Sequence, residues 1–199
     1  MKLTPILALA LVLLAGCAAR APSLQLVALP AAPVASAAPQ VNGLVLTLRR
    51  VALPEYLQSR EVRFRDGAAG VTSWPGSVWA ERVEVGATRE LAIALRRALP
   101  AVLVCDSACA EAMPTRRVLA VDVVKLDVDR AARRLDSELR WSLLDPRSVQ
   151  TAPVTGVVAR SLPLDGDSAE AAARGLSALL GAAAEDVAQT LAARAAAGG

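Results

Sequence analysis

The stretch Leu135-Asp136-Ser137-Glu138-Leu139-Arg140-Trp141-Ser142-Leu143 has the clearest alternation of apolar and charged side chains in the sequence. Its apolar side chains fall on one face (Leu135, Leu139, Trp141, Leu143) and its charged ones on the other (Asp136, Glu138, Arg140). A period of two residues is typical of a β-strand with one buried face and one solvated face. The stretch therefore predicts a half-buried, antiparallel sheet.

Further strands and two helices are expected around this stretch. Strands are expected at 44–48, 62–64, 118–128 and 149–162, with a further short strand within 24–29. Residues 66–76 contain glycine and proline and are expected to form a loop. Apolar residues spaced by three and four predict one helix from Trp79 to Ala98 and another from a capping box at Asp167 and Glu170 to Leu191. The fold class is therefore α+β, a two-layer sandwich of a mainly antiparallel sheet with two helices on one face.

The N-terminus has the pattern of a bacterial lipoprotein signal. Lys2 precedes an apolar run that ends in Leu14-Ala15-Gly16-Cys17, the form of a lipobox. The run is shorter than the roughly 18 apolar residues that a membrane span needs. We expect residues 1–16 to be removed and Cys17 to carry diacylglycerol and a further acyl chain such as palmitate. A plain signal peptide cut elsewhere is the alternative.

The mature chain is expected to have two parts. Residues 17–40, rich in alanine and proline, are expected to act as a tether that spans about 70 Å at roughly 3.3 Å per residue. Residues 41–199 are expected to form a periplasmic domain. Ala18 stands where an aspartate usually signals retention in the inner membrane, so we expect the outer membrane, with the domain facing the periplasm.

The composition disfavours catalysis, metal binding and nucleic-acid binding. The chain has no histidine, a net charge of +3 and none of the glycine-rich loops that hold phosphates. The clusters Arg116–Arg117 and Arg133–Arg134 are expected to be solvated strand ends. Asp127 and Asp129 form either an acidic pair or, as we expect, part of a solvated face. We therefore expect no enzyme activity and no cofactor.

Cys105 and Cys109 are the two cysteines that remain once Cys17 carries lipid. An even pair in an oxidising compartment predicts a disulfide that closes a small loop. A redox pair is the alternative, but redox pairs usually have the spacing Cys-x-x-Cys. Metal binding is disfavoured because histidine and a second cysteine pair are missing.

Two short motifs resemble the PqiC-like family of ABC-type transport auxiliary lipoproteins. The first is Leu53-Pro54-Glu55-Tyr56-Leu57 within residues 51–62, and the second is Trp79-Ala80-Glu81 at the expected helix start. The resemblance covers nearly the whole mature chain. Gln58-Ser59-Arg60 departs from the Asp-Arg-Pro that family members often have at this point, and the pair Cys105 and Cys109 is not typical of the family.

The resemblance implies an accessory role in lipid transport. It implies a non-catalytic outer-membrane subunit of an MCE-type system, which moves lipid between the two membranes and supports envelope integrity. The implied partners are a periplasmic MCE-domain protein, its membrane permease, the membrane itself and lipid, while a homo-oligomer is left open. The alternative is a pilotin-like or outer-membrane assembly lipoprotein.

Five residues are candidates for partner binding. Tyr56, Leu57, Trp79 and Glu81 match the family's motifs, and Trp74 is expected to be exposed in its loop. The alternative for Tyr56 and Leu57 is that they hold the strand crossing, and for Trp79 that it packs under the first helix.

Overall fold

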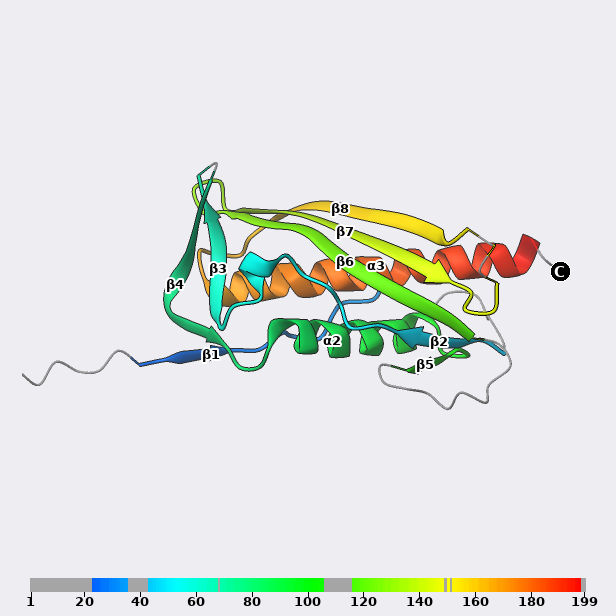
Figure 1. Cartoon of the computed structure of the whole chain (residues 1–199). Coiled ribbons are helices and arrows are strands. Elements are labelled where there is room, and N and C mark those ends of the chain that lie inside the picture. Colours follow the sequence, from blue (N-terminus) through cyan, green and yellow to red (C-terminus); the bar gives the residue numbers. More distant parts are fainter. Residues whose placement is uncertain are drawn as a thin grey trace, which may run out of the picture.

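A computed structural model describes residues 23–35, 43–67, 69–105, 116–148, 150 and 152–197 (Figure 1). The strands are β1 (Gln25–Val27), β2 (Val45–Leu48), β3 (Glu61–Asp66), β4 (Gly70–Trp79), β5 (Leu103–Cys105), β6 (Arg116–Asp129), β7 (Arg134–Leu144) and β8 (Val154–Pro163). The helices are the short 3-10 helix η1 (Glu55–Leu57), α2 (Val83–Ala98) and α3 (Ala169–Ala197).

The larger sheet has five strands in the order β5-β2-β6-β7-β8. Strands β6, β7 and β8 form an antiparallel meander, in which Val121 of β6 lies opposite Trp141 of β7. Strand β2 runs parallel to both β5 and β6, so the sheet is mixed. The alternation in β7 is confirmed, since Leu135, Leu139, Trp141 and Leu143 are all buried.

Helices α2 and α3 lie side by side against one face of this sheet (Figure 1). The core between the layers is built mainly from leucine, valine and alanine, and its most buried leucines include Leu91, Leu95, Leu176, Leu179 and Leu180. The indole Nε1 of Trp141 donates a hydrogen bond to Oδ2 of Asp186 on α3, at 2.7 Å, and so joins the two layers. The predicted α+β sandwich with two helices on one face is confirmed.

A second, smaller sheet corrects the expectation of a loop at residues 66–76. Strands β1, β4 and β3 form a three-stranded sheet, in which β4 is antiparallel to β3 and parallel to β1. Pro75 and Gly76 lie inside β4 and not in a loop. The φ angle of Gly76 is +71°. A proline and a glycine inside a strand often mark an irregular position, and here the register between β3 and β4 shifts between Glu61 and Arg63.

Both predicted helix starts were placed too early. Trp79 is the last residue of β4, and α2 begins at Val83. The backbone N–H of Ala80 bonds to the carbonyl of Val27 at 2.8 Å, so the pairing with β1 extends to this residue and keeps it outside the helix. Helix α3 begins after Ser168, whose Oγ accepts the backbone N–H of Ala171 at 3.2 Å. Ser168 is therefore the N-cap in place of the predicted Asp167.

Residues 23–35, expected as part of the tether, pack on the domain. Strand β1 pairs with β4, and Val27, Leu29 and Ala32 are buried. The Oγ of Ser177 donates to the carbonyl of Pro30 at 2.8 Å, which fixes the segment along α3. This part of the expected tether therefore belongs to the domain. Among the described helices, none is both long enough and apolar enough to cross a bilayer.

Candidate functional site

The two motif segments lie next to each other, although they are far apart in the sequence. Helix η1 contains Tyr56 and Leu57 and leads into β3, while β4 ends at Trp79. The backbone N–H of Trp79 bonds to the carbonyl of Arg60 at 2.8 Å, so the end of β4 is held against the start of β3. The fold thus brings Tyr56, Leu57, Trp79 and Glu81 into one region.

Tyr56 is half-buried, and its hydroxyl is held by a charged network. Its Oη donates to Oδ1 of Asp127 at 3.3 Å, and the guanidinium of Arg65 lies 5.7 Å from its ring centre. Nε of Arg65 lies 3.0 Å from the same Asp127 oxygen. Burial, together with the charge of Asp127, raises the pKa of Tyr56. The hydroxyl therefore remains a protonated donor at neutral pH.

Leu57 and Trp79 are core residues, as the alternative reading expected. Their exposed fractions are 6% and 8%. They face the same small interior space of about 10 Å³, between β3, the start of α2 and α3. Neither side chain offers much surface to a partner, and both hold the crossing of the two motif segments.

Glu81 is partly exposed, and its carboxylate contacts Arg89, which also contacts Glu90. Nη1 of Arg89 lies 2.6 and 2.8 Å from the two carboxylate oxygens of Glu81. Nε of Arg89 lies 3.3 Å from Glu90 Oε1. The hydrogen bond to Glu81 is the main cause that raises the pKa of the Arg89 guanidinium. Glu81 therefore fixes the loop before α2 to the second turn of that helix.

Exposed residues of the two motif segments form a surface, which we call the motif surface. It consists of two shallow hollows of about 280 and 630 Å³ that share Gln58 and Ser59. Its solvent-accessible side chains are Glu55, Tyr56, Gln58, Ser59, Arg60, Arg63, Glu81 and Arg82. We did not predict Gln58, Ser59 and Arg60 as site residues, although the sequence departs from the family pattern at these three positions.

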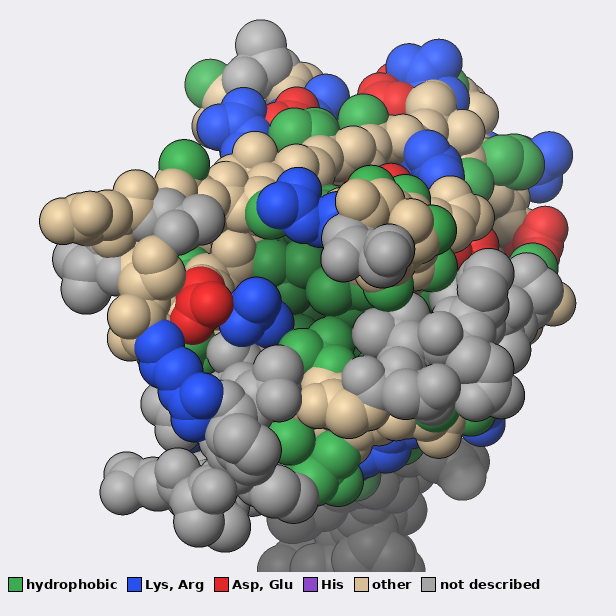
Figure 2. Space-filling model, turned by 90° about the vertical axis from the view of Figure 1, so that its right-hand side faces the viewer, with side chains coloured by type: hydrophobic (Ala, Val, Ile, Leu, Met, Phe, Trp, Pro, Cys, Tyr) green, Lys and Arg blue, Asp and Glu red, His purple; other side chains and the backbone are tan. Residues whose placement is uncertain are grey.

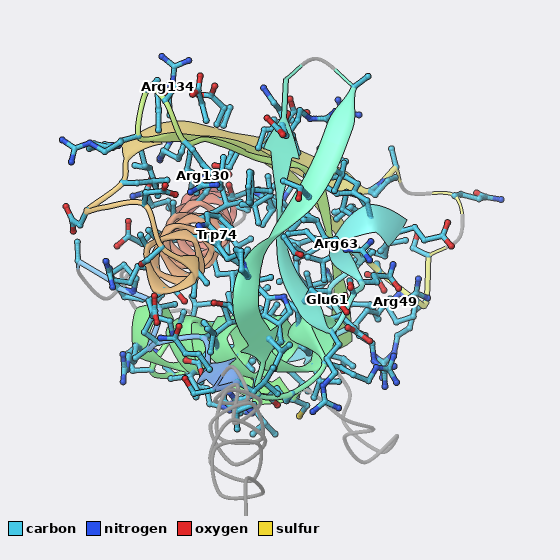
Figure 3. All side chains as sticks on the ribbon, turned by 90° about the vertical axis from the view of Figure 1, so that its left-hand side faces the viewer. Arg49, Glu61, Arg63, Trp74, Arg130 and Arg134 are labelled. Carbon is cyan, nitrogen blue, oxygen red and sulfur yellow. The ribbon has the colours of Figure 1, made fainter. Side chains whose placement is uncertain are left out.

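Trp74 lies elsewhere, and the prediction that it is exposed is wrong. Its exposed fraction is 6%, and its ring centre lies 4.5 Å from that of Phe64. Its Nε1 donates to Oδ1 of Asp167 at 3.2 Å. The guanidinium carbon of Arg130 lies 4.7 Å from the ring centre of Phe64. Nε of Arg130 lies 2.6 Å from Oδ1 of Asp167. Trp74 and Arg130 lie beside the end of α3, whereas Glu61 and Arg63 lie on the other side of the β3–β4 hairpin (Figure 3).

Phe64, Arg130 and Asp167 border a charged groove of about 1000 Å³ between the β3–β4 hairpin and the ends of β6 and β7. Its charged lining residues are Arg65, Asp66, Lys125, Asp127, Asp129, Arg130, Asp136 and Asp167. Asp127 contacts Arg65 and Lys125, and Asp167 contacts Arg130. A groove with this many charges is unsuited to burying an acyl chain.

Several carboxylates of the groove are held by hydrogen bonds. Oγ of Ser161 donates to Oδ1 of Asp136 at 2.7 Å, and this hydrogen bond is the main cause that lowers the pKa of Asp136. Asp129 accepts the backbone N–H of Ala132 at 2.9 Å. With its pKa lowered, Asp136 stays ionised at neutral pH and is a poor proton donor. Within the described ranges, no group of three His, Cys, Asp or Glu side chains is arranged to hold a metal ion.

The predicted lipid and disulfide sites are only partly described. Cys17 and Cys109 lie outside the described residues, so the acylation and the Cys105–Cys109 disulfide stay predictions. Cys105 is the last residue of β5, a strand that lies toward the end of the molecule opposite the three-stranded sheet (Figure 1). Figure 2 shows this end, where hydrophobic side chains gather in a hollow.

Comparison with known proteins gives a family and a fold. The family described as ABC-type transport auxiliary lipoprotein component matches residues 25–188. A search of curated protein sequences gives no match. The crystal structure of an uncharacterized protein is similar, with a TM-score of 0.69 and 16% identity over 85% of this chain and 99% of that chain.

Two further solved structures are similar at lower scores. Protein XCC0632 from Xanthomonas campestris, of family DUF330, has a TM-score of 0.60 and 18% identity over 84% of this chain and 93% of that chain. A PelC dodecamer from Paraburkholderia phytofirmans has a TM-score of 0.43 and 17% identity over 78% of this chain and 95% of that chain. At identities of 16% and 18%, the uncharacterized protein and protein XCC0632 show that this chain shares their fold.

Proposed function

The chain belongs to the family of ABC-type transport auxiliary lipoprotein components, and from this membership we propose that it is the outer-membrane subunit of an MCE-type lipid transport system. In this role it is anchored through Cys17, faces the periplasm and binds a periplasmic MCE-domain protein that works with a membrane permease. The system carries lipid between the membranes and so supports envelope integrity.

The observation that carries the proposal is the order of two features along the chain. The lipobox ends at Cys17, and the family match begins at residue 25. A lipid-anchored residue is thus followed, after a short connection, by a domain of a transport family. Diacylglycerol and a third acyl chain together hold a protein firmly on a membrane, because each buried CH₂ contributes about 0.8 kcal/mol.

The geometry of the described residues supports a binding role. The charged groove contains carboxylates that are held ionised by hydrogen bonds and ion pairs, which does not favour acid–base chemistry. The motif surface, in contrast, combines charged and amide side chains on a rigid base formed by Leu57 and Trp79. Polar side chains form the solvent-accessible rim of protein interfaces, and tyrosine and arginine, both present here, are enriched in them.

The test is affinity capture of the acylated protein from mildly solubilised envelopes. We expect an MCE-domain protein and its permease to be recovered, and we expect cells that lack the protein to become sensitive to detergents. The Cys17→Ser variant is the control, because it removes the acyl chains and leaves the domain unchanged. Recovery of a secretin without an MCE protein would overturn the proposal in favour of a pilotin-like role.

A further inference from the structure

Leu24, directly before β1, and Leu26 in β1 expose their side chains to solvent on the described segment nearest in sequence to the predicted anchor. The exposed fractions of Leu24 and Leu26 are 60% and 62%, which makes them, with Val157, the most exposed large apolar side chains among the described residues. They stand two positions apart, so they point to the same side of the strand. Such side chains cost free energy in water, and neighbouring ones mark an interaction surface.

The strand is fixed to the domain, and therefore the leucines cannot turn inward. Strand β1 pairs with β4 over residues 25–27, and Val27 is buried behind it. Gln25, between the two leucines, points the other way, where its amide donates to Glu170 and its Oε1 accepts from Ser77 at 3.4 Å. The opposite side of the strand is thus already occupied, and the leucines remain on the outer side.

The length of chain before β1 determines how far this side can be from a membrane. Five residues, 18–22, separate Cys17 from Ser23. Seven steps from Cys17 to Leu24 span at most about 25 Å, even when the chain is fully extended. Because residues 25–35 belong to the domain, they add nothing to this reach. A domain anchored at Cys17 therefore keeps β1 close to the lipid surface.

We propose that Leu24 and Leu26 form a membrane-contact site through which β1 rests on the lipid surface that holds the Cys17 anchor. The inference rests on the anchor of the proposed function, and it goes further by giving the domain an orientation. The three-stranded sheet faces the membrane, and the opposite end of the molecule, shown in Figure 2, faces away from it.

The depth of the contact follows from the backbone of β1. This strand lies at the edge of its sheet, so one row of its N–H and C=O groups lacks a strand partner. Such groups need water and are not found exposed in the hydrocarbon core of a bilayer. The strand therefore stays at the headgroup level, and only the two leucine side chains enter the boundary with the acyl chains.

The charges near β1 allow this approach to a membrane. Two carboxylates lie near β1. Glu170 accepts a hydrogen bond from the amide of Gln25, on the side of the strand away from the leucines. Glu61 lies opposite Val78 of β4 and is paired with Arg63 at 3.5 Å. Arg20 lies between Cys17 and β1 in the sequence and adds a positive charge beside the anchor. An unpaired carboxylate at this place would be repelled by acidic lipid headgroups, whereas an arginine is attracted.

The test uses the acylated full-length mature protein in vesicles of phosphatidylethanolamine and phosphatidylglycerol. A Leu26→Cys variant carries a small fluorophore, and quenching is measured with lipids that bear a quencher just below the headgroup. Val157→Cys on β8 is the matched control, because Val157 is exposed to 60% on another edge strand. The protein without a new cysteine gives the background labelling.

We expect strong quenching at Leu26 and little at Val157, with Leu24→Cys behaving like Leu26→Cys. Equal quenching at positions 26 and 157, or none at position 26, overturns the inference. The vesicles contain no protein partner, so the outcome does not depend on the transport system. Mass spectrometry of Cys17 tests the anchor separately: a chain without acyl groups contradicts the proposed function, whereas an acylated chain without quenching contradicts the membrane contact alone.

Discussion

The indole Nε1 of Trp74 lies 3.2 Å from Oδ1 of Asp167, and this hydrogen bond joins the β3–β4 hairpin to the residue just before the N-cap of α3. Arg130, in the turn between β6 and β7, contacts the same carboxylate and covers the ring of Phe64. Three parts of the chain that are distant in sequence therefore meet at one carboxylate.

The Trp74→Phe substitution should lower the free energy of unfolding by about 1–3 kcal/mol, because it removes a hydrogen bond to an ionised acceptor and part of a buried ring. Urea unfolding measures the change. In a double-mutant cycle with Asp167→Ala, the two effects should not add, since each substitution removes the same bond. Asp165→Asn, on the same loop, is the control and should have little effect. Simple additivity in the cycle would contradict this account.

The stability that Asp167 contributes should disappear at acidic pH. The hydrogen bond from Arg130, followed by that from Trp74, lowers the pKa of Asp167 in the folded protein. A carboxyl with a lowered folded pKa stabilises the fold above its unfolded pKa of about 3.9, and the contribution is lost as the pH falls through the folded value. The unfolding free energies of the wild type and Asp167→Asn should therefore differ most above pH about 5 and converge below it. A difference that does not change with pH would exclude this contact as the cause.

Gly181→Ala should destabilise the protein, although alanine usually stabilises a helix by about 1 kcal/mol relative to glycine. A Cβ at position 181 would lie 2.0 Å from the backbone carbonyl oxygen of Pro33, so the segment before it would have to move. Gly86→Ala in α2 is the matched control, because its Cβ meets only side-chain atoms of Glu81 and Leu29 at 3.3–3.4 Å. Thermal unfolding should separate the two variants, and similar melting temperatures would contradict the close packing of residues 30–35 on α3.

Arg60→Glu should weaken partner capture through the motif surface. Arg60 is exposed beside Ser59, and its backbone carbonyl already holds the end of β4, so the substitution changes surface charge with little effect on the fold. Arg160→Glu on β8 is the control, since Arg160 is also exposed but lies on the other sheet. We expect recovery of the MCE-domain protein to fall for the first variant alone. Equal recovery with both variants would place the partner on a different surface.

Much of the fold could be predicted from the sequence where one face of an element is buried and the other is solvated. Strand β7 is such an element, and its buried leucines lie where the alternation placed them. The sequence does not predict strand β4, because Thr72, Ser73, Pro75 and Gly76 interrupt the alternation of apolar and polar side chains. Its pairing depends on β1 and β3, whose contacts are tertiary and leave no periodic signal in the sequence.

The candidate site was predicted in part, through the family resemblance. The resemblance identified two motifs, and the fold brings them together at the contact between Arg60 and Trp79. The burial of Trp74 could not be predicted, because its hydrogen-bond partner Asp167 lies 93 residues away. The neighbours Gln58 and Ser59 were missed because they depart from the family pattern, and only the geometry of η1 and β3 shows that they line the motif surface.

The packing of residues 25–35 on the domain also affects how it would meet a partner. A domain on a long flexible linker samples a large volume. A domain joined to its anchor by only a few residues moves with that anchor in the plane of the membrane. Encounters then depend on the number of anchored copies per unit area of membrane and on lateral diffusion. With the proposed anchor at Cys17, a partner from the opposite membrane would itself have to extend across the compartment, because residues 25–35 pack on the domain and add nothing to its reach.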